Sequence, residues 1–355
     1  MAQIEIPRTQ KAAVLVNPGK GLEVISNHPV TQPSELKPGQ CLVKMHCTGV
    51  CHTDVHIAAG EVPHGPVPLV GGHEGIGTIV ALGPAEGGVV KVGTRVGVRW
   101  LCYACGKCEL CRRGKEAACE SRKLAGHLVD GTFCQYMVAW SDHVVPIPDN
   151  VSDEQAVPVL CAGLTVYAAL KACNAVPGDW VVIPGAGGGL GHLAIQYAHA
   201  LGLKVVAVDT GDDKKDICLD LGAEKWIDFK QTDDIVRDIV ATCDGKGAHT
   251  ALIVTASPRA YEDSVKYLRT AGSIAVIGIP GPFVWSIPVA LILRKSLHII
   301  GHLLGTYQET VEALELVAQK KVVGHVNHRK LEDINDVFKD ITQANVVGRT
   351  VIRLQ

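Results

Sequence analysis

Apolar and polar residues follow two different patterns along the chain. In the first 150 residues, short apolar segments are separated by glycine and proline, and helical periods are few. Short strands divided by frequent turns are typical of a β-rich, barrel-like domain. The pattern predicts strands at 11–16, 41–47, 77–82 and 136–145.

From residue 180 onward, continuously apolar segments alternate with amphipathic ones. Strands without polar alternation are buried on both faces, as in a parallel sheet covered by helices. Six such strands are typical of a doubly wound dinucleotide-binding domain. We expect strands at 180–184, 205–209, 226–229, 250–254, 274–278 and 297–301, with helices at 192–201 and 214–221. A helix at 308–320 and a strand at 350–353 are expected to follow.

Length and charge limit the classes of function. A chain of 355 residues favours two domains, and its net charge of -2 gives no electrostatic reason to expect nucleic acid or an anionic membrane as partner. The most apolar stretch, 288–304, contains two basic residues and two histidines, so it is a poor membrane span. The first twenty residues lack the pattern of a secretory signal, and we expect a cytoplasmic protein.

Five of the thirteen cysteines lie between residues 102 and 119. In a reducing compartment, clustered cysteines hold metal more often than they form disulfides. The spacing C-x2-C-x2-C-x7-C predicts a closed, structural zinc site with four thiolate ligands, Cys105, Cys108, Cys111 and Cys119. A shifted set that begins at Cys102 and leaves Cys119 spare is also possible.

A second set of metal-binding residues is spread along the chain. Cys51, His73 and Cys161 could supply two thiolates and one imidazole, which is a known ligand set of catalytic zinc with one open position. Each of these residues alone is more often part of the packing than a ligand. Together, and beside the four-cysteine loop, they predict a catalytic zinc site.

The segment 184–191 contains five glycines between a predicted strand and a predicted helix. No register gives a strict G-x-G-x-x-G, and a tight turn without a ligand is the alternative interpretation. The context nevertheless favours a Rossmann-type pyrophosphate site at the helix N-terminus. Asp209 ends the next predicted strand, where a carboxylate binds the adenosine ribose hydroxyls and repels a 2′-phosphate, so NAD is favoured over NADP.

These motifs resemble those of the medium-chain zinc alcohol dehydrogenases, most closely the fungal, yeast-type tetrameric branch. The resemblance covers essentially the whole chain and rests on Cys51-His52-Thr53-Asp54-x-His56, Leu69-Val70-Gly71-Gly72-His73-Glu74-Gly75, Trp100-Leu101 and the four-cysteine loop. Cys102 departs from it, as a thiol that the family loop does not need. The resemblance implies an α/β fold with a GroES-like, β-barrel-type catalytic domain (1–162 and 305–355) and a Rossmann domain with a doubly wound parallel sheet for NAD (163–304).

The resemblance also implies roles for individual residues near the catalytic zinc. Cys51, His73 and Cys161 would be its ligands, and Glu74 would be a transient further ligand. Asp54 would accept the ring N–H of His73. Thr53 would hold the substrate hydroxyl, and His56 would receive the proton through the cofactor ribose. The NAD-binding residues would be His52, Thr53, His56, Gly187, Gly188, Gly189, Leu190, Asp209, Lys214, Ile277, Ile279, His302, Leu304 and Arg349.

The expected function is therefore reversible oxidation of primary, and also secondary or aromatic, alcohols to aldehydes or ketones by hydride transfer to NAD. Two zinc ions per chain and a homotetramer, or a dimer, are expected. A zinc polyol or formaldehyde–glutathione dehydrogenase is the alternative, but the His52 and His56 pair favours simple alcohols. The second zinc set and the absence of a basic surplus disfavour a non-enzymatic zinc protein, and a zinc-free reductase would lack both zinc motifs. Ala58 and Val62 replace tryptophans of the yeast-type enzymes, which predicts a wider substrate pocket.

Overall fold

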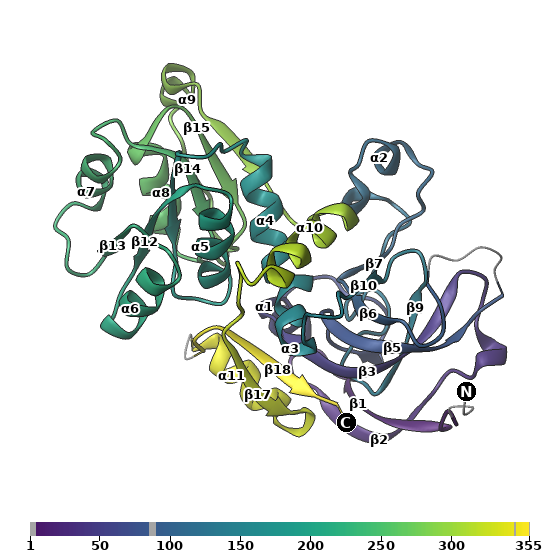
Figure 1. Cartoon of the computed structure of the whole chain (residues 1–355). Coiled ribbons are helices and arrows are strands. Elements are labelled where there is room, and N and C mark those ends of the chain that lie inside the picture. The colour runs from purple at the N-terminus through teal and green to yellow at the C-terminus, as the bar shows by residue number, and fades with distance from the viewer. Residues whose placement is uncertain (1–4, 85–89, 344–345, 355) are drawn as a thin grey trace. The chain divides into compact units, whose positions relative to one another are not determined.

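The computed structural model describes residues 5–84, 90–343 and 346–354 and divides the chain into two compact units (Figure 1). The first unit contains residues 1–161, 306–318 and 326–355. The second contains residues 162–305 and 319–325. Each unit is built around its own sheet system, and the expected β-rich first part and α/β second part are both confirmed.

The first unit is organised around β3 (Gln40–Val50). One edge of β3 pairs antiparallel with β5, whereas the other edge pairs first with β9 and then with β18. The strands of the resulting seven-stranded sheet are β3, β5 (Gly75–Leu82), β6 (Arg95–Val98), β9 (Tyr136–Trp140), β10 (Val145–Pro146), β17 (Val326–Lys330) and β18 (Arg349–Arg353). Since β3 changes partners along its length, the sheet curves around a core that contains Val43, Met45 and Phe133.

Smaller elements complete this unit. A second sheet has the strand order β2-β1-β4, and a two-stranded ribbon, β7-β8, lies at the base of the four-cysteine loop. The strands are β1 (Thr9–Leu15), β2 (Glu23–Pro29), β4 (Leu69–Val70), β7 (Leu101–Tyr103) and β8 (Lys123–Leu124). The helices longer than one turn are α1 (His52–Ala58), α10 (Tyr307–Ala318) and α11 (Ile334–Thr342). The short helical turns are η1 (Pro33–Glu35), α2 (Glu109–Arg112), η2 (Glu116–Ala118), α3 (Asp153–Ala156), η3 (Val157–Leu160) and η4 (Leu331–Asp333).

The second unit contains one six-stranded parallel sheet with the order β13-β12-β11-β14-β15-β16. Numbered within the sheet, this is the 3-2-1-4-5-6 order of the doubly wound dinucleotide-binding fold. The strands are β11 (Trp180–Pro184), β12 (Lys204–Asp209), β13 (Lys225–Asp228), β14 (Ala248–Ile253), β15 (Leu268–Val276) and β16 (His298–Gly301). The helices are α4 (Ala162–Ala172), α5 (Gly191–Ala200), α6 (Asp212–Asp220), α7 (Ile235–Thr242), α8 (Pro258–Tyr267) and α9 (Val289–Lys295). The prediction of six parallel strands is confirmed.

The strand expected at 136–145 differs from the sequence-based expectation. Two strands, β9 and β10, stand where a single strand was expected, because residues 141–144 form a turn in which the N–H groups of His143 and Val144 both donate to the Trp140 carbonyl.

Within the described residues no single helix is long and apolar enough to span a membrane, although the bent pair 153–160 and 162–172 meets the same test of length and composition.

Candidate active site

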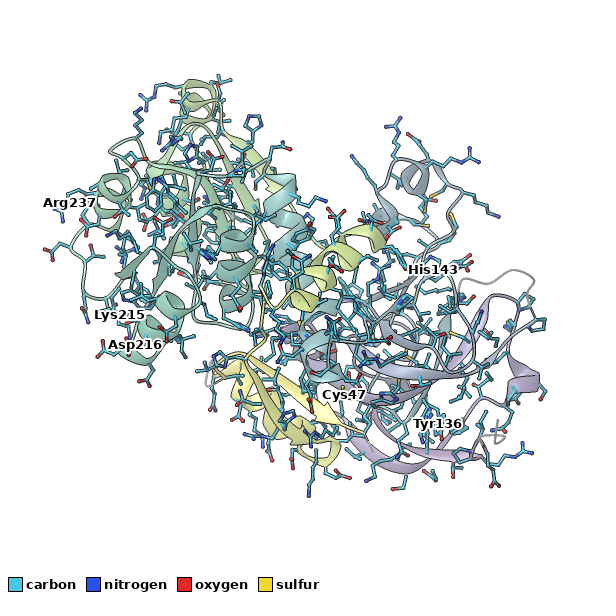
Figure 2. The ribbon with its side chains drawn as sticks, viewed as in Figure 1. Cys47, Tyr136, His143, Lys215, Asp216 and Arg237 are labelled. Atoms are coloured by element: carbon cyan, nitrogen blue, oxygen red, sulfur yellow. The ribbon has the colours of Figure 1, made fainter. Side chains whose placement is uncertain are left out.

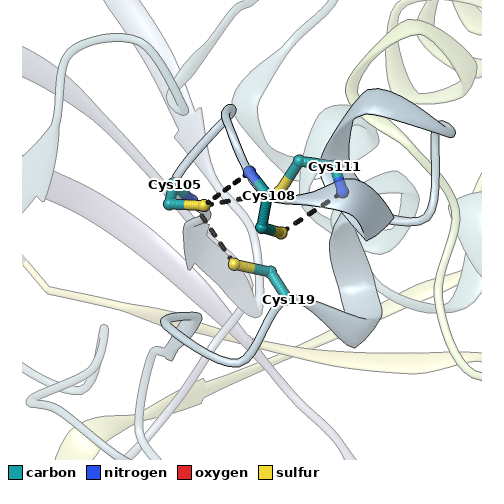
Figure 3. Close-up of side chains that lie close together, drawn as sticks. All are labelled: Cys105, Cys108, Cys111 and Cys119. Atoms are coloured by element: carbon teal, nitrogen blue, oxygen red, sulfur yellow. Dashed lines mark hydrogen bonds between the residues drawn. The ribbon is translucent and has the colours of Figure 1, made fainter.

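The four cysteines Cys105, Cys108, Cys111 and Cys119 converge within one loop (Figure 3). Their sulfurs lie within 4.8 Å of one another. Backbone N–H groups point at these sulfurs, and the N–H groups of Lys107 and Cys108 lower the pKa of Cys105 to about 6. Sulfur atoms that gather at this spacing with backbone donors around them suit a tetrahedral ion held by thiolates.

Cys102 lies apart from this cluster. It is buried, its sulfur donates to the Lys123 carbonyl at 3.3 Å, and burial raises its pKa to about 12. Cys102 is not among the four cysteines whose sulfurs lie within 4.8 Å of one another. The structure therefore favours the register that begins at Cys105 over the shifted one that begins at Cys102.

Cys51, His73, Glu74 and Cys161 form a second cluster, far apart in sequence but within 4.8 Å of one another. Cys51 directly precedes α1, His73 lies two residues before the start of β5, and Cys161 directly follows η3. The two sulfurs are 3.8 Å apart, and the His73 Nε2 atom is 3.4 Å from the Cys161 sulfur. A tetrahedral ion bound at about 2.3 Å by two thiolates holds their sulfurs about 3.8 Å apart, so the donor set fits zinc.

Asp54 fixes the orientation of His73. The Asp54 carboxylate accepts the Nδ1–H of His73 at 2.8 Å with one oxygen, and the N–H of Cys51 at 2.8 Å with the other. Both Asp54 and His73 are almost fully buried. A carboxylate that holds Nδ1 leaves Nε2 as the metal-binding nitrogen, which is the usual arrangement of a histidine ligand.

Glu74 is fully buried and forms an ion pair with Arg349 at the start of β18. Burial raises the pKa of Glu74 to about 7, against the opposing charge of Arg349. Its second carboxylate oxygen has no hydrogen-bond partner among the described residues. Gly49 makes room for the side chain, because a Cβ atom there would lie 2.5 Å from the Glu74 carboxyl carbon. The free oxygen is compatible with Glu74 as a further metal ligand.

Thr53, His52 and His56 project from α1 next to this cluster. The Thr53 hydroxyl is 3.7 Å from the Cys51 sulfur, and the rings of His52 and His56 are stacked at 4.8 Å. The His56 Nδ1 atom is 2.5 Å from a carboxylate oxygen of Glu61, a residue that the sequence did not single out. His56 is only partly buried and Glu61 is exposed, so the contact between them lies at the surface of this unit.

In the second unit, the expected NAD residues lie where strands of the sheet end. Gly187, Gly188, Gly189 and Leu190 form the turn between β11 and α5, and Asp209 ends β12. Ile277 and Ile279 follow β15, whereas His302 and Leu304 follow β16. The carboxyl ends of parallel strands meet at one edge of the sheet, which is the ligand-binding edge of this fold.

Asp209 connects the glycine turn to Lys214. Its carboxylate accepts the N–H of Gly187 at 3.0 Å and the Lys214 ammonium at 3.1 Å. Figure 2 labels the neighbouring Lys215 and Asp216 on α6, and both are exposed. Lys214 is partly buried instead, and its side chain faces the binding edge rather than solvent alone.

The turn itself requires glycine. A Cβ atom at Gly191 would lie 2.2 Å from the Gly185 carbonyl oxygen, and Gly185 has a φ of +82°. Side chains larger than hydrogen would therefore not fit at Gly191, and the chain turns tightly into the N-terminus of α5, where this fold binds a pyrophosphate. The remaining expected NAD residue, Arg349, belongs to the first unit, where Glu74 is its partner.

The two small residues that predicted a wide substrate pocket occupy different surroundings. Ala58 is buried in the core of the first unit, beside a cavity of about 10 Å³ that Leu15 and Phe133 also line. Val62 is partly buried in the segment that joins α1 to β4. The pocket hypothesis therefore rests on Val62 and Trp100, whose ring lies 6.0 Å from that of His73.

Comparison with known proteins identifies the family. Residues 37–149 match the alcohol dehydrogenase GroES-like domain, and residues 189–319 match the zinc-binding dehydrogenase family. An alcohol dehydrogenase from Schizosaccharomyces pombe is 39% identical over 98% of this chain and 99% of its own length. Among solved structures, the alcohol dehydrogenase of Aeropyrum pernix is 30% identical with a TM-score of 0.86, covering 97% of this chain and 99% of that one.

A further solved structure, acetophenone reductase from Geotrichum candidum in complex with NAD, is 26% identical with a TM-score of 0.86 and covers 98% of both chains. The similarity to the Schizosaccharomyces pombe enzyme extends over essentially the full length of both chains. The solved structures share the same architecture. This chain belongs to the medium-chain, zinc-binding alcohol dehydrogenase family.

Proposed function

We propose that this chain oxidises primary alcohols reversibly to aldehydes by transferring hydride to NAD, with one catalytic and one structural zinc ion. The observation that carries the proposal is the buried Cys51–His73–Cys161 cluster, whose spacing suits zinc and whose histidine is oriented by Asp54. Its substrate would be a small-molecule alcohol or aldehyde, with neither nucleic acid nor a membrane as partner, and the expected location is the cytoplasm.

The bound groups would supply the reactive chemistry, and the chain would supply orientation and proton transfer. Zinc in the buried cluster would act as a Lewis acid that makes the alcohol hydroxyl more acidic, and NAD would accept the hydride. The Thr53 hydroxyl, 3.7 Å from the Cys51 sulfur, would hold the substrate hydroxyl. His56 would take up the proton, and its contact with Glu61 would stabilise the charge that His56 gains.

Initial rates on linear and aromatic alcohols with NAD and with NADP test this function. We expect NAD-linked oxidation of primary alcohols that is lost when zinc is removed by a chelator and recovered when zinc is added back. No oxidation of any alcohol by the zinc-loaded protein would contradict the proposal.

Asp209→Gly is expected to shift cofactor preference toward NADP. Removing the carboxylate removes the repulsion of a 2′-phosphate, and the ratio of kcat/KM for NAD to that for NADP should fall at least about tenfold, or ~1.4 kcal/mol. Asp209→Asn is the matched control, since it keeps an acceptor for the Gly187 N–H but loses the charge. Wild-type protein that already prefers NADP would show that this interpretation of Asp209 is wrong.

Val62→Trp is expected to reverse the ranking of alcohols by size. Each added methylene of a substrate buries surface worth about 0.8 kcal/mol, so two should raise kcat/KM roughly tenfold in the wild type. Medium or benzylic alcohols should therefore be better substrates than ethanol, and an indole at residue 62 should favour ethanol. A wild-type ranking headed by ethanol, or a ranking that Val62→Trp leaves unchanged, would count against the wide pocket.

The chain is expected to form a homotetramer or a dimer. We expect β16 to be part of the interface between subunits. This strand is an edge of the six-stranded sheet and carries the exposed Ile299, and the chain shortly before it carries two more exposed apolar residues, Val284 at 89% exposure and Leu293 at 73%. An open apolar edge readily pairs with a strand of another chain. Ile299→Lys should therefore lower the mass measured by light scattering, whereas a wild type that is monomeric at micromolar concentration would refute the expectation.

A further inference from the structure

His127 connects the ring of Trp100 to the segment that carries Val62. The His127 ring is stacked on the Trp100 ring at a centroid distance of 5.6 Å and an interplanar angle of 8°. The Trp100 ring also lies 6.0 Å, from centroid to centroid, from the ring of His73, a member of the buried metal cluster. Trp100 therefore lies beside the cluster, and the ring of His127 packs flat against it.

His127 is also hydrogen-bonded to the segment between α1 and β4. Its Nε2 atom is 2.5 Å from the Pro63 carbonyl oxygen. Because a carbonyl only accepts, Nε2 must carry the proton. The His127 carbonyl in turn accepts the N–H of Gly65 at 2.6 Å. Two hydrogen bonds thus join His127 to residues immediately after Val62.

The backbone around His127 is itself fixed. The N–H groups of His127, Leu128 and Val129 all point at the Leu124 carbonyl, and Ala125 donates to the Trp100 carbonyl at 2.8 Å. Residues 61–68, by contrast, contain no helix or strand. A segment without its own ladder of hydrogen bonds depends on contacts from outside for its position. His127 provides two of them to this segment.

We propose that His127 is a positioning residue for substrate selection: it holds Trp100 and the Val62–Pro63 segment together as one wall of the alcohol site. The inference rests on the proposed function, and it assigns to His127 a part in how the alcohol-binding pocket discriminates between alcohols. A long alcohol contacts more of this wall than ethanol does. Loosening the wall therefore costs the long alcohol more of its binding contacts, and the loss appears in KM.

Kinetics of His127→Ala with 1-hexanol and with ethanol test the proposal. The kcat/KM for 1-hexanol should fall at least about fivefold more than that for ethanol, mainly through a higher KM, because a wall contact contributes to binding before chemistry. His127→Phe keeps a ring for Trp100 but has no donor for Pro63, and His127→Gln keeps a donor but no ring. Each should give a smaller fall than His127→Ala.

His328→Ala is the matched control, because it removes an exposed histidine of the same unit, on β17. A 1-hexanol to ethanol ratio within twofold of wild type in His127→Ala, with full zinc content and an unchanged melting temperature, would overturn the proposal. If His127→Ala does not fold, an unchanged ratio in both His127→Phe and His127→Gln would overturn it equally.

A second measurement separates this inference from the proposed function. Hydrogen exchange of residues 61–66, followed by mass spectrometry in the zinc-loaded protein, needs no activity. It should become faster in His127→Ala and stay unchanged in His328→Ala. A wild type that oxidises no alcohol would refute the proposed function alone, whereas unchanged exchange in His127→Ala would refute the role of His127.

Discussion

His73→Ala should abolish alcohol turnover while leaving the fold nearly intact. The variant removes the imidazole of the buried cluster, and the loss of Lewis-acid catalysis, worth several kcal/mol, corresponds to a fall in kcat/KM of at least about a thousandfold. The melting temperature should fall less than in Cys108→Ser, because the four-thiolate site is separate. Zinc content should fall from two ions to one per chain.

Cys108→Ser should act mainly on stability, and it should destabilise the protein more than His73→Ala does. It breaks the four-thiolate cluster in a loop without a hydrophobic core of its own, where zinc contributes directly to folding. Cys102→Ala is the matched control, since this neighbouring thiol lies outside the cluster and should keep both ions. Turnover within tenfold of wild type in His73→Ala, or equal loss of zinc in Cys102→Ala, would show that the assignment of the clusters is wrong.

Arg349→Met should destabilise the protein by about 3 kcal/mol, because breaking a buried ion pair leaves an uncompensated carboxyl group. Arg349 and Glu74 are almost fully buried, and Glu74 already has an oxygen without a partner among the described residues. The free energy of unfolding from urea titration measures the effect. We expect the destabilisation to be largest in the zinc-loaded protein at pH 8, because this pH lies above the raised pKa of Glu74 and the carboxyl group is then charged.

The double variant Glu74→Gln with Arg349→Met serves as the control for this pair. Removing the carboxylate charge should restore more than half of the lost stability, because a neutral amide is less costly to bury. Strictly additive losses in the double variant, or a single variant as stable as wild type, would contradict the assigned pairing.

The sequence predicted the parts of the fold in which burial leaves a local pattern. The central strands β11, β12 and β14 were found because they are apolar and buried on both faces, and the edge strands β13 and β16 were found from short apolar segments although they are partly exposed. The start of β15 at Leu268 was not predicted, because Arg269, Thr270 and Gly272 interrupt its apolar pattern. Similarly, β2 was missed because Ser26, Asn27 and His28 give it no alternation of apolar and polar residues.

Only some residues of the candidate site could be predicted from the sequence. The metal ligands were predictable where their spacing is typical of a zinc site, as in the four-cysteine loop, or where they belong to a family motif, as at His73 and Glu74. The supporting contacts were not predictable. The approach of Gly49 to Glu74 and of His127 to Pro63 depends on how separate segments pack. A glycine or a histidine in the sequence does not by itself indicate such a contact.

Elemental analysis of the purified wild-type protein beside His73→Ala shows directly whether the buried cluster holds zinc. We expect two zinc ions per chain in the wild type and one in the variant, which should retain the ion of the four-cysteine loop. One ion or none in the wild type, or two in His73→Ala, would contradict a catalytic zinc held by Cys51, His73 and Cys161.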